Sequence, residues 1–306
     1  MRRLLALAMV LFLCVGTAHA LTVMVISDSG YEADGITDAD SKDVAGGGKY
    51  VDTAMVDYLK SLGYTVDTSG LGGTYRDIDK NKKGYTTNQW WAGLDGRLAA
   101  IQNADLVILS RYGDSGSYDA DAKPWNGLAT PLLSQSGHMS RGTGQAGGSQ
   151  KWGWNDWKNA AQTKIPTILD VFETSHPFVQ GFSNPITLFN WSTGQAQVAV
   201  QNALGNYPAG ATLIGTYDNT WMLVDIPAGS DFDALNNTTG IYGVAGERRV
   251  YFGHWGYDGK AIYSWDLDIT ADYKALFAQV VAQTIPEPAT IALLGIGGLA
   301  LLRKRG

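Results

Sequence analysis

The sequence is nearly free of cysteine. Its 306 residues include one, Cys14, close to the N-terminus. A body without cysteine forms no disulfide and offers neither a thiol nucleophile nor a thiolate metal ligand. The folded part must therefore be stabilised by its hydrophobic core. Histidine is scarce as well, with four in the chain, so histidine chemistry rests on few positions.

Basic residues are also in the minority. The chain has 23 Lys and Arg against 29 Asp and Glu. Five of the basic residues and one of the acidic ones lie in the two terminal segments described below, which leaves the body with a net charge of −10. Nucleic-acid binding needs a basic footprint. We therefore expect no nucleic-acid partner.

The N-terminus has the three features of a secretory signal peptide. Met1-Arg2-Arg3 is basic, Leu4 to Val15 is apolar, and Ala18-His19-Ala20 places small residues where a signal peptidase cleaves. The apolar run is shorter than the ~20 residues that span a bilayer. We expect residues 1–20 to be removed after export through the Sec translocon, leaving a body of residues 21–285.

The C-terminus is a second exceptional segment. Pro286-Glu287-Pro288 breaks any helix, Ala289 to Leu302 is uncharged and mostly apolar, and Arg303-Lys304-Arg305 ends the segment with positive charge. A 14-residue helix reaches ~21 Å, short of a ~30 Å hydrocarbon core. With its flanks, residues 286–306 are expected to hold a short transmembrane segment that anchors the chain transiently, with the basic end at the cytoplasmic surface. The alternative is a buried terminal helix.

This order of tripeptide, apolar segment and basic end resembles the PEP-CTERM sorting signal, over Ile285 to Gly306. The resemblance implies a Gram-negative bacterium that makes an extracellular polysaccharide, and processing near the tripeptide by an exosortase. It implies sorting from the inner membrane to the cell surface or extracellular matrix. It does not indicate what the body does.

The first half of the body alternates apolar strand patterns with helical ones. Such alternation predicts an α/β, three-layer sandwich with a mostly parallel central sheet. The expected strands are Leu21–Ile26, Tyr64–Asp67, Asp105–Ser110 and Pro131–Ser136. The expected helices are Lys49–Gly63, Asn88–Asn103, and a helix or turn over Pro124–Thr130.

The second half reads as a β-rich flank that ends in a helix. Short strands are expected at Ala211–Thr216, Trp221–Ile226, Gly240–Ala245 and Arg249–His254, and the final helix at Ile269–Gln283. They either extend the sheet or form a separate flank.

The order of elements resembles the class I glutamine amidotransferase-like fold, including its trehalose-utilisation-like branch. The residues that carry the resemblance are Leu21–Ser27, Ala104–Ser110, Ser175–Gly181 and Arg248–His254. The amidotransferases use a Cys on a sharp turn after a strand. Here the matching segment is Ser134-Gln135-Ser136-Gly137-His138, which has no Cys and no Gly-x-Cys-x-Gly. We therefore expect no glutamine hydrolysis by that mechanism.

Several polar residues are candidates for catalysis or metal binding. Ser136 beside His138 has the composition of a nucleophile and base. The favoured alternative is an ordinary polar strand exit, because a triad is recognised by its geometry. His176 precedes Pro177 and either lines a site or caps a turn. His254 and Asp258 share one predicted strand exit. Convergence of His138, His176 and His254 with an Asp would suit zinc or iron.

Two further segments have alternative interpretations. The acidic stretch Asp28 to Asp43 is a calcium candidate, but it lacks EF-hand spacing and also fits a solvated loop. Tryptophans Trp152, Trp154, Trp157 and Trp255 either stack on sugar rings or fill the core.

Two functions follow from this sequence. The first is a non-catalytic, exported domain that binds extracellular polysaccharide. The second is a secreted hydrolase that acts on a glycan or small molecule through His and Asp residues at the sheet edge.

Overall fold

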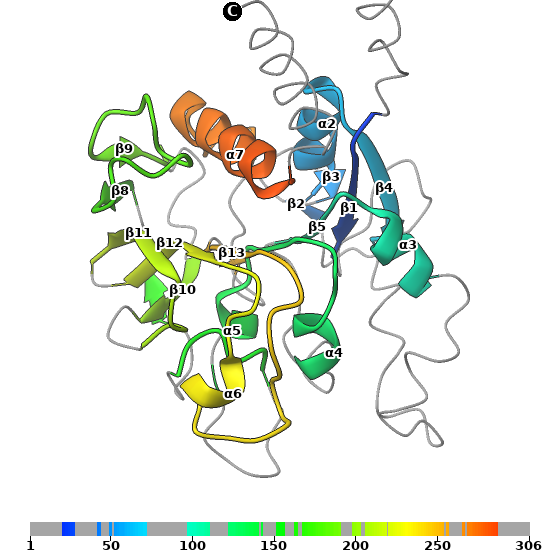
Figure 1. The fold of residues 1–306 in the computed structure, drawn as a ribbon. Helices are drawn as coiled ribbons and strands as arrows, with labels where there is room; N and C mark the ends of the chain where they lie inside the picture. Colours follow the sequence, from blue (N-terminus) through cyan, green and yellow to red (C-terminus); the bar gives the residue numbers. More distant parts are fainter. Residues whose placement is uncertain are drawn as a thin grey trace, which may run out of the picture.

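The computed structural model describes residues 20–27, 42–43, 49–50, 52–71, 97–110, 122–140, 142, 151–156, 162–164, 167–190, 198–202, 206–218, 220–253, 255–256, 265–266 and 268–286. Within these ranges the chain is a mixed α/β structure built around one large sheet (Figure 1).

The strands are β1 (Thr22–Ile26), β2 (Lys42–Asp43), β3 (Lys49–Tyr50), β4 (Thr65–Gly70), β5 (Leu106–Leu109), β6 (Leu132–Ser134), β7 (Gln162–Lys164), β8 (Ile168–Val171), β9 (Ile186–Thr187), β10 (Val198–Asn202), β11 (Thr212–Tyr217), β12 (Thr220–Ile226), β13 (Arg249–Phe252) and β14 (Trp255–Gly256). The helices are α2 (Thr53–Ser61), α3 (Arg97–Asn103), α4 (Ala122–Asn126), α5 (Gly137–Ser140), α6 (Phe232–Leu235) and α7 (Ala271–Thr284).

The sheet is parallel in one half and antiparallel in the other. Its main order is β4-β1-β5-β6-β13-β12-β11-β8-β9. The pairs from β4 to β13 are parallel, and every pair from β13 to β9 is antiparallel. The expectation of a mostly parallel sheet was therefore wrong for the second half, where the predicted β-rich flank instead continues the same sheet. The tight turn between β11 and β12 is one source of the difference, because antiparallel neighbours can be joined by a short connection, whereas parallel neighbours need a crossover.

Helices cover both faces of the sheet. Successive strand residues point to opposite faces, so Val23 and Val25 of β1 join one core cluster while Met24 and Ile26 join the other. The first cluster contains side chains from α2 and α7, and the second contains side chains from α3, α4 and α6. Figure 1 shows α7 on one side of the sheet and α4 and α6 on the other. These two cores make the described part a three-layer arrangement.

Several sequence predictions match the observed elements closely. The expected first strand, third strand and final helix correspond to β1, β5 and α7. The expected helix at Lys49–Gly63 starts later, at Thr53, because Lys49–Tyr50 pairs as a short strand with Lys42–Asp43. Gly63 follows the end of α2 with a φ of 93°, the left-handed conformation that a glycine after a helix adopts readily.

The strand expected at Gly240–Ala245 was wrong. In this segment the structure records one isolated bridge, between Asp231 and Val244. The amides of Gly240 and Gly243 donate to Asp233 Oδ2, and those of Ile241 and Tyr242 donate to Asp233 Oδ1, at 2.8–3.1 Å. Because these amides point at one carboxylate, they are not available to a neighbouring strand.

No helix in the described ranges is long and apolar enough to cross a membrane. The tail Ala289–Leu302 and the signal segment Leu4–Val15, where terminal helices were expected, lie outside those ranges.

Candidate functional site

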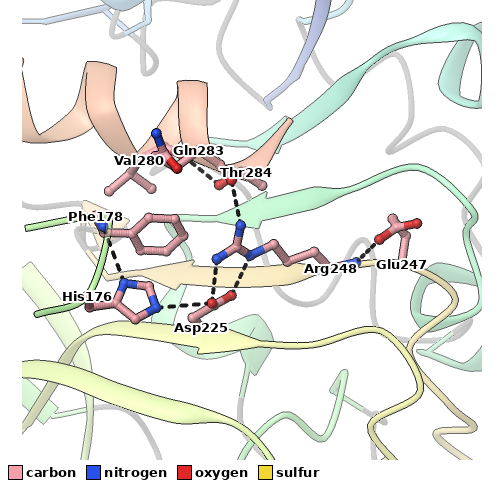
Figure 2. Close-up of polar contacts among 8 residues, drawn as sticks. All are labelled: His176, Phe178, Asp225, Glu247, Arg248, Val280, Gln283 and Thr284. Carbon is pink, nitrogen blue, oxygen red and sulfur yellow. Dashed lines mark hydrogen bonds and ion pairs between the residues drawn. The ribbon is translucent and has the colours of Figure 1, made fainter. Parts of the chain in front are cut away.

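A charged cluster in the described part of the chain is centred on Asp225, near the end of β12. Arg248 Nε donates to Asp225 Oδ1 at 2.7 Å, and Arg248 Nη2 donates to Asp225 Oδ2 at 2.5 Å. His176 Nε2 lies 3.3 Å from Asp225 Oδ2. We call His176, Phe178, Asp225 and Arg248 the Asp225 cluster (Figure 2).

The cluster joins four parts of the chain. His176 and Phe178 come from the turns after β8, Asp225 from β12, and Arg248 from the residue before β13. Arg248 Nη1 donates to the carbonyl of Gln283 in α7, and its guanidinium carbon lies 4.7 Å from the centre of the Phe178 ring. The cluster therefore attaches the C-terminal end of α7 to the antiparallel half of the sheet (Figure 2).

Opposing influences set the charge of Asp225. Burial favours the neutral acid, but the hydrogen bonds and positive charge from Arg248, together with those from His176, outweigh burial and hold the pKa of Asp225 below its ordinary value. Asp225 is therefore ionised at neutral pH. Its side chain is 15% exposed, so this ion pair is only partly screened by water.

Both ring nitrogens of His176 have partners. The Phe178 amide donates to Nδ1 at 3.3 Å, and a backbone amide can only donate, so Nδ1 carries the lone pair. Nε2 therefore carries the proton and faces Asp225. The lone pair that a general base needs is occupied in this arrangement, which fits a role in shaping the turn and holding Asp225.

The acid stability of the protein provides a test of the Asp225 cluster. Because the folded pKa of Asp225 is depressed, its ion pair contributes stability above about pH 4, and that contribution is lost as pH falls through the folded pKa. Asp225→Asn should lower the free energy of unfolding by about 1–2 kcal/mol at pH 7, since both partners keep some exposure. The penalty should shrink progressively below about pH 4.

Urea denaturation of residues 21–285 at several pH values measures this difference. Asp170→Asn on β8 is the control, because the Asp170 side chain is exposed. An Asp225→Asn penalty that is the same at pH 7 and pH 3 would contradict the assignment.

A second group of polar residues lies at the carboxyl ends of the parallel strands. Ser27 follows β1, Ser110 follows β5, and Ser136 follows β6, and all three are buried. Ser110 Oγ donates to Asp52 Oδ2 at 2.7 Å. Ligands of open α/β sheets bind at this edge. The Asp225 cluster lies at the opposite edge, because Arg248 precedes β13, which runs parallel to β6.

Of the candidate catalytic residues predicted from the sequence, Ser136 lies at this edge of the sheet. It is 0% exposed, and its Oγ has no hydrogen-bond partner in the described structure. His138 belongs to α5, but its side chain lies outside the described structure, as do His254 and Asp258. The pairing of Ser136 with His138 and the convergence of three histidines therefore stay predictions.

Two of the four predicted sugar-stacking tryptophans lie in the core. Trp152 and Trp154 are both 0% exposed, and their ring centres are 5.4 Å apart. Trp154 Nε1 donates to Asn126 Oδ1 at 2.8 Å. Stacking on a sugar needs an exposed ring face, so these two side chains act in packing, contrary to the binding interpretation. Trp157 and the Trp255 side chain are outside the described structure.

Metal binding has no support from the ranges that the structure describes, where no group of three His, Cys, Asp or Glu side chains is close enough to hold an ion. The acidic stretch considered for calcium, Asp28 to Asp43, lies outside those ranges except for the backbone of its last two residues.

Sequence reasoning missed the roles of Asp225 and Arg248. Both lie within or beside predicted strands, and the adjacent basic residues Arg248 and Arg249 were the available signal. Because neighbouring strand residues face opposite sides, one of two adjacent arginines must point at each helical layer. The partners of each depend on strand order, which the sequence did not supply.

Comparison with known proteins identifies the tail. Residues 284–305 match the PEP-CTERM protein-sorting motif. The predicted sorting signal is thus confirmed, and the motif implies export, recognition by an exosortase, and sorting to the cell surface of a Gram-negative bacterium. No curated protein matches the chain.

Two solved structures align with most of this chain. The cytoplasmic protein STM3548 from Salmonella typhimurium aligns with a TM-score of 0.45 at 14% identity, over 88% of this chain and 100% of its own. The cytoplasmic protein STM1381 from Salmonella typhimurium LT2 aligns with a TM-score of 0.44 at 12% identity, over 87% of this chain and 100% of its own. Neither match bears out the amidotransferase-like resemblance.

Proposed function

We propose that the protein is exported through the Sec translocon, cleaved by signal peptidase after Ala20, and processed at its tail by an exosortase, so that residues 21–285 reach the cell surface or matrix. The match of residues 284–305 to the sorting motif carries this proposal. The basic start, apolar run and Ala18-His19-Ala20 site support the N-terminal step.

We further propose that the body has a non-catalytic role, in association with extracellular polysaccharide. Two observations support a role without catalysis. The chain has no cysteine after Cys14, and His176 has both ring nitrogens occupied, by the Phe178 amide and by Asp225. We propose polysaccharide as the partner because the sorting signal is typical of bacteria that secrete a polysaccharide matrix.

Replacement of Pro286, Glu287 and Pro288 by alanine tests the sorting step. The full-length precursor should accumulate in the membrane, and the shorter product should disappear, because the tripeptide is what the enzyme recognises. Immunoblotting of cell fractions measures both species. The unaltered chain in a strain without the exosortase is the control and should behave like the triple variant. An unchanged yield of shorter product from the variant would contradict the proposal.

A secreted hydrolase is the second candidate, and one observation favours it. Buried Ser136, with its unpartnered Oγ, and Ser110, which donates to Asp52, both follow parallel strands at the edge where such folds bind ligands. Turnover of a glycan panel by residues 21–285, lost in Ser136→Ala, would favour the hydrolase. Binding to matrix polysaccharide that survives Ser136→Ala and His176→Ala would favour the non-catalytic role.

A further inference from the structure

The matched sorting motif begins inside the folded body. Its first residue, Thr284, is the last residue of α7, and it is 1% exposed, while Ile285 is 6% exposed and belongs to the main hydrophobic core. Thr284 Oγ1 donates to the Val280 carbonyl at 2.6 Å, and the Ile285 amide donates to the Val281 carbonyl at 3.3 Å. No spacer separates the body from Pro286.

The end of α7 is also held from the side. Arg248 Nη1 donates to the Gln283 carbonyl, and Arg248 is itself fixed by Asp225 and by the Phe178 ring (Figure 2). One turn earlier, Gln279 Nε2 donates to the carbonyls of Pro177 and Gln180. Unwinding the last turn would break the bond from Arg248 and expose Ile285. The body therefore presents Pro286 in a fixed position.

A hollow lies directly beside Pro286. It has a volume of about 380 Å³ and is lined by Glu247, Arg248 and the chain from Ala282 to Pro286. We call it the Pro286 hollow. Pro286 is both a wall of this hollow and the first residue of the tripeptide. Two residues of chain span at most ~7 Å, so an enzyme that holds the whole tripeptide must lie against the hollow.

We propose that the Pro286 hollow is a docking surface for the enzyme that processes the sorting signal, so that the enzyme binds the folded body and the tripeptide together. The inference rests on the exosortase processing proposed above. Asp225 pairs with Arg248, so Glu247, whose charge also acts on buried Arg249, is the remaining charged side chain of the wall. The complementary surface of the partner is therefore a basic or hydrogen-bond-donating group.

Inserting a spacer distinguishes docking of the enzyme on the folded body from simple accessibility of the tripeptide. Insertion of Gly-Ser-Gly-Ser-Gly between Ile285 and Pro286 in the full-length chain keeps the body and the sequence from Pro286 onward intact. Docking predicts that processing slows by at least about fivefold, since the hollow and the tripeptide no longer reach the enzyme at once. Pulse-chase labelling measures the rate. Unchanged or faster processing would overturn the proposal.

A charge reversal tests the hollow itself. Glu247→Lys should slow processing by at least about fivefold by repelling the basic group of the partner. Asp170→Lys makes the same change of charge on β8, three strands away from β13, and should process at the normal rate. Resistance of each full-length variant to limited proteolysis checks the fold. Equal rates for the two variants would overturn the proposal.

The unaltered chain and the triple-alanine variant are included in each experiment. If the unaltered chain is not processed, exosortase sorting itself fails. If it is processed, the triple-alanine variant is not, and the spacer and Glu247→Lys have no effect, then sorting stands and docking at the Pro286 hollow fails.

Discussion

Replacement of Arg249 by methionine is expected to lower the free energy of unfolding by about 3–5 kcal/mol. Arg249 is 0% exposed, and within the described ranges its guanidinium donates only to backbone carbonyls. Nη2 donates to Asn126 at 2.7 Å and to Leu128 at 2.6 Å, and Nη1 donates to Thr130 at 3.0 Å. The side chain thus holds the turn after α4 against β13.

Two terms oppose one another at this position. Burial lowers the pKa of Arg249 to about 9, against the opposite effect of the Glu247 charge, which shows that burying this cation is unfavourable. Methionine removes that cost. It also leaves the carbonyls of Leu128 and Thr130 buried without their donor, at about 1–3 kcal/mol each. Because Trp125 and Leu128 of this segment belong to the hydrophobic core, we expect the loss of donors to dominate.

The matched control is the neighbouring residue. Arg248 faces the α7 side and its side chain is 27% exposed, so Arg248→Met should cost less than Arg249→Met. Arg249→Lys should lower the free energy of unfolding by an amount between those of the two methionine variants, because an ammonium group donates fewer hydrogen bonds in one plane. Guanidinium denaturation followed by tryptophan fluorescence measures all three. A change below about 1 kcal/mol for Arg249→Met would show that relief of the buried charge dominates.

Replacement of Trp154 by alanine is expected to lower the free energy of unfolding by about 3–5 kcal/mol, the range for large buried aromatics. The ring lies between Trp152 and Phe232, with centre distances of 5.4 and 6.4 Å. Its Nε1 bond to Asn126 is also lost. Asn126 in turn donates to the carbonyls of Trp152 and Tyr242, so the loss should spread through this cluster.

This prediction separates the core role from a sugar-binding role. Trp154→Phe keeps most of the volume and loses the hydrogen bond, so it should cost about 1–2 kcal/mol. Phe172→Ala is the surface control, since Phe172 is 62% exposed. Thermal and chemical denaturation measure stability, and polysaccharide pull-down measures binding. A stable Trp154→Ala variant that no longer binds polysaccharide would restore the sugar-stacking interpretation.

The parts of the fold that sequence reasoning predicted are those with a local signal. β1 and β5 are continuous apolar runs, which is typical of strands buried on both faces. α7 has helical spacing of Tyr273, Leu276 and Phe277 and begins after Thr270, whose side chain accepts a hydrogen bond from the Tyr273 amide. Gly63 ends α2 as predicted. Such signals depend only on neighbouring residues, so they can be recognised without knowledge of the tertiary structure.

The parts that sequence reasoning missed depend on distant partners. β8 and β9 are short, with two to four residues each, and gain their conformation from pairing with each other and with β11. The segment Gly240–Ala245 has strand-like composition, but the carboxylate of Asp233 determines its conformation. For the tryptophans the sequence allowed both a core position and a surface position, because composition does not specify which loops cover them.

The sequence by itself revealed the sorting signal of this protein, which the match of residues 284–305 confirms. The tripeptide at Pro286, the apolar segment and the basic end form a linear pattern, so their order along the chain is enough to identify them. The acidic, cysteine-free body was determined in the same way.

Only the tertiary structure decided how that signal is presented. The packing of Ile285 in the core, the bond from Arg248 to Gln283, and the hollow beside Pro286 all join residues that are far apart in the sequence. Such contacts depend on strand order and on the path of α7 across the sheet. The free energy that fixes them comes from burial and from charges brought together by folding, which no local pattern encodes.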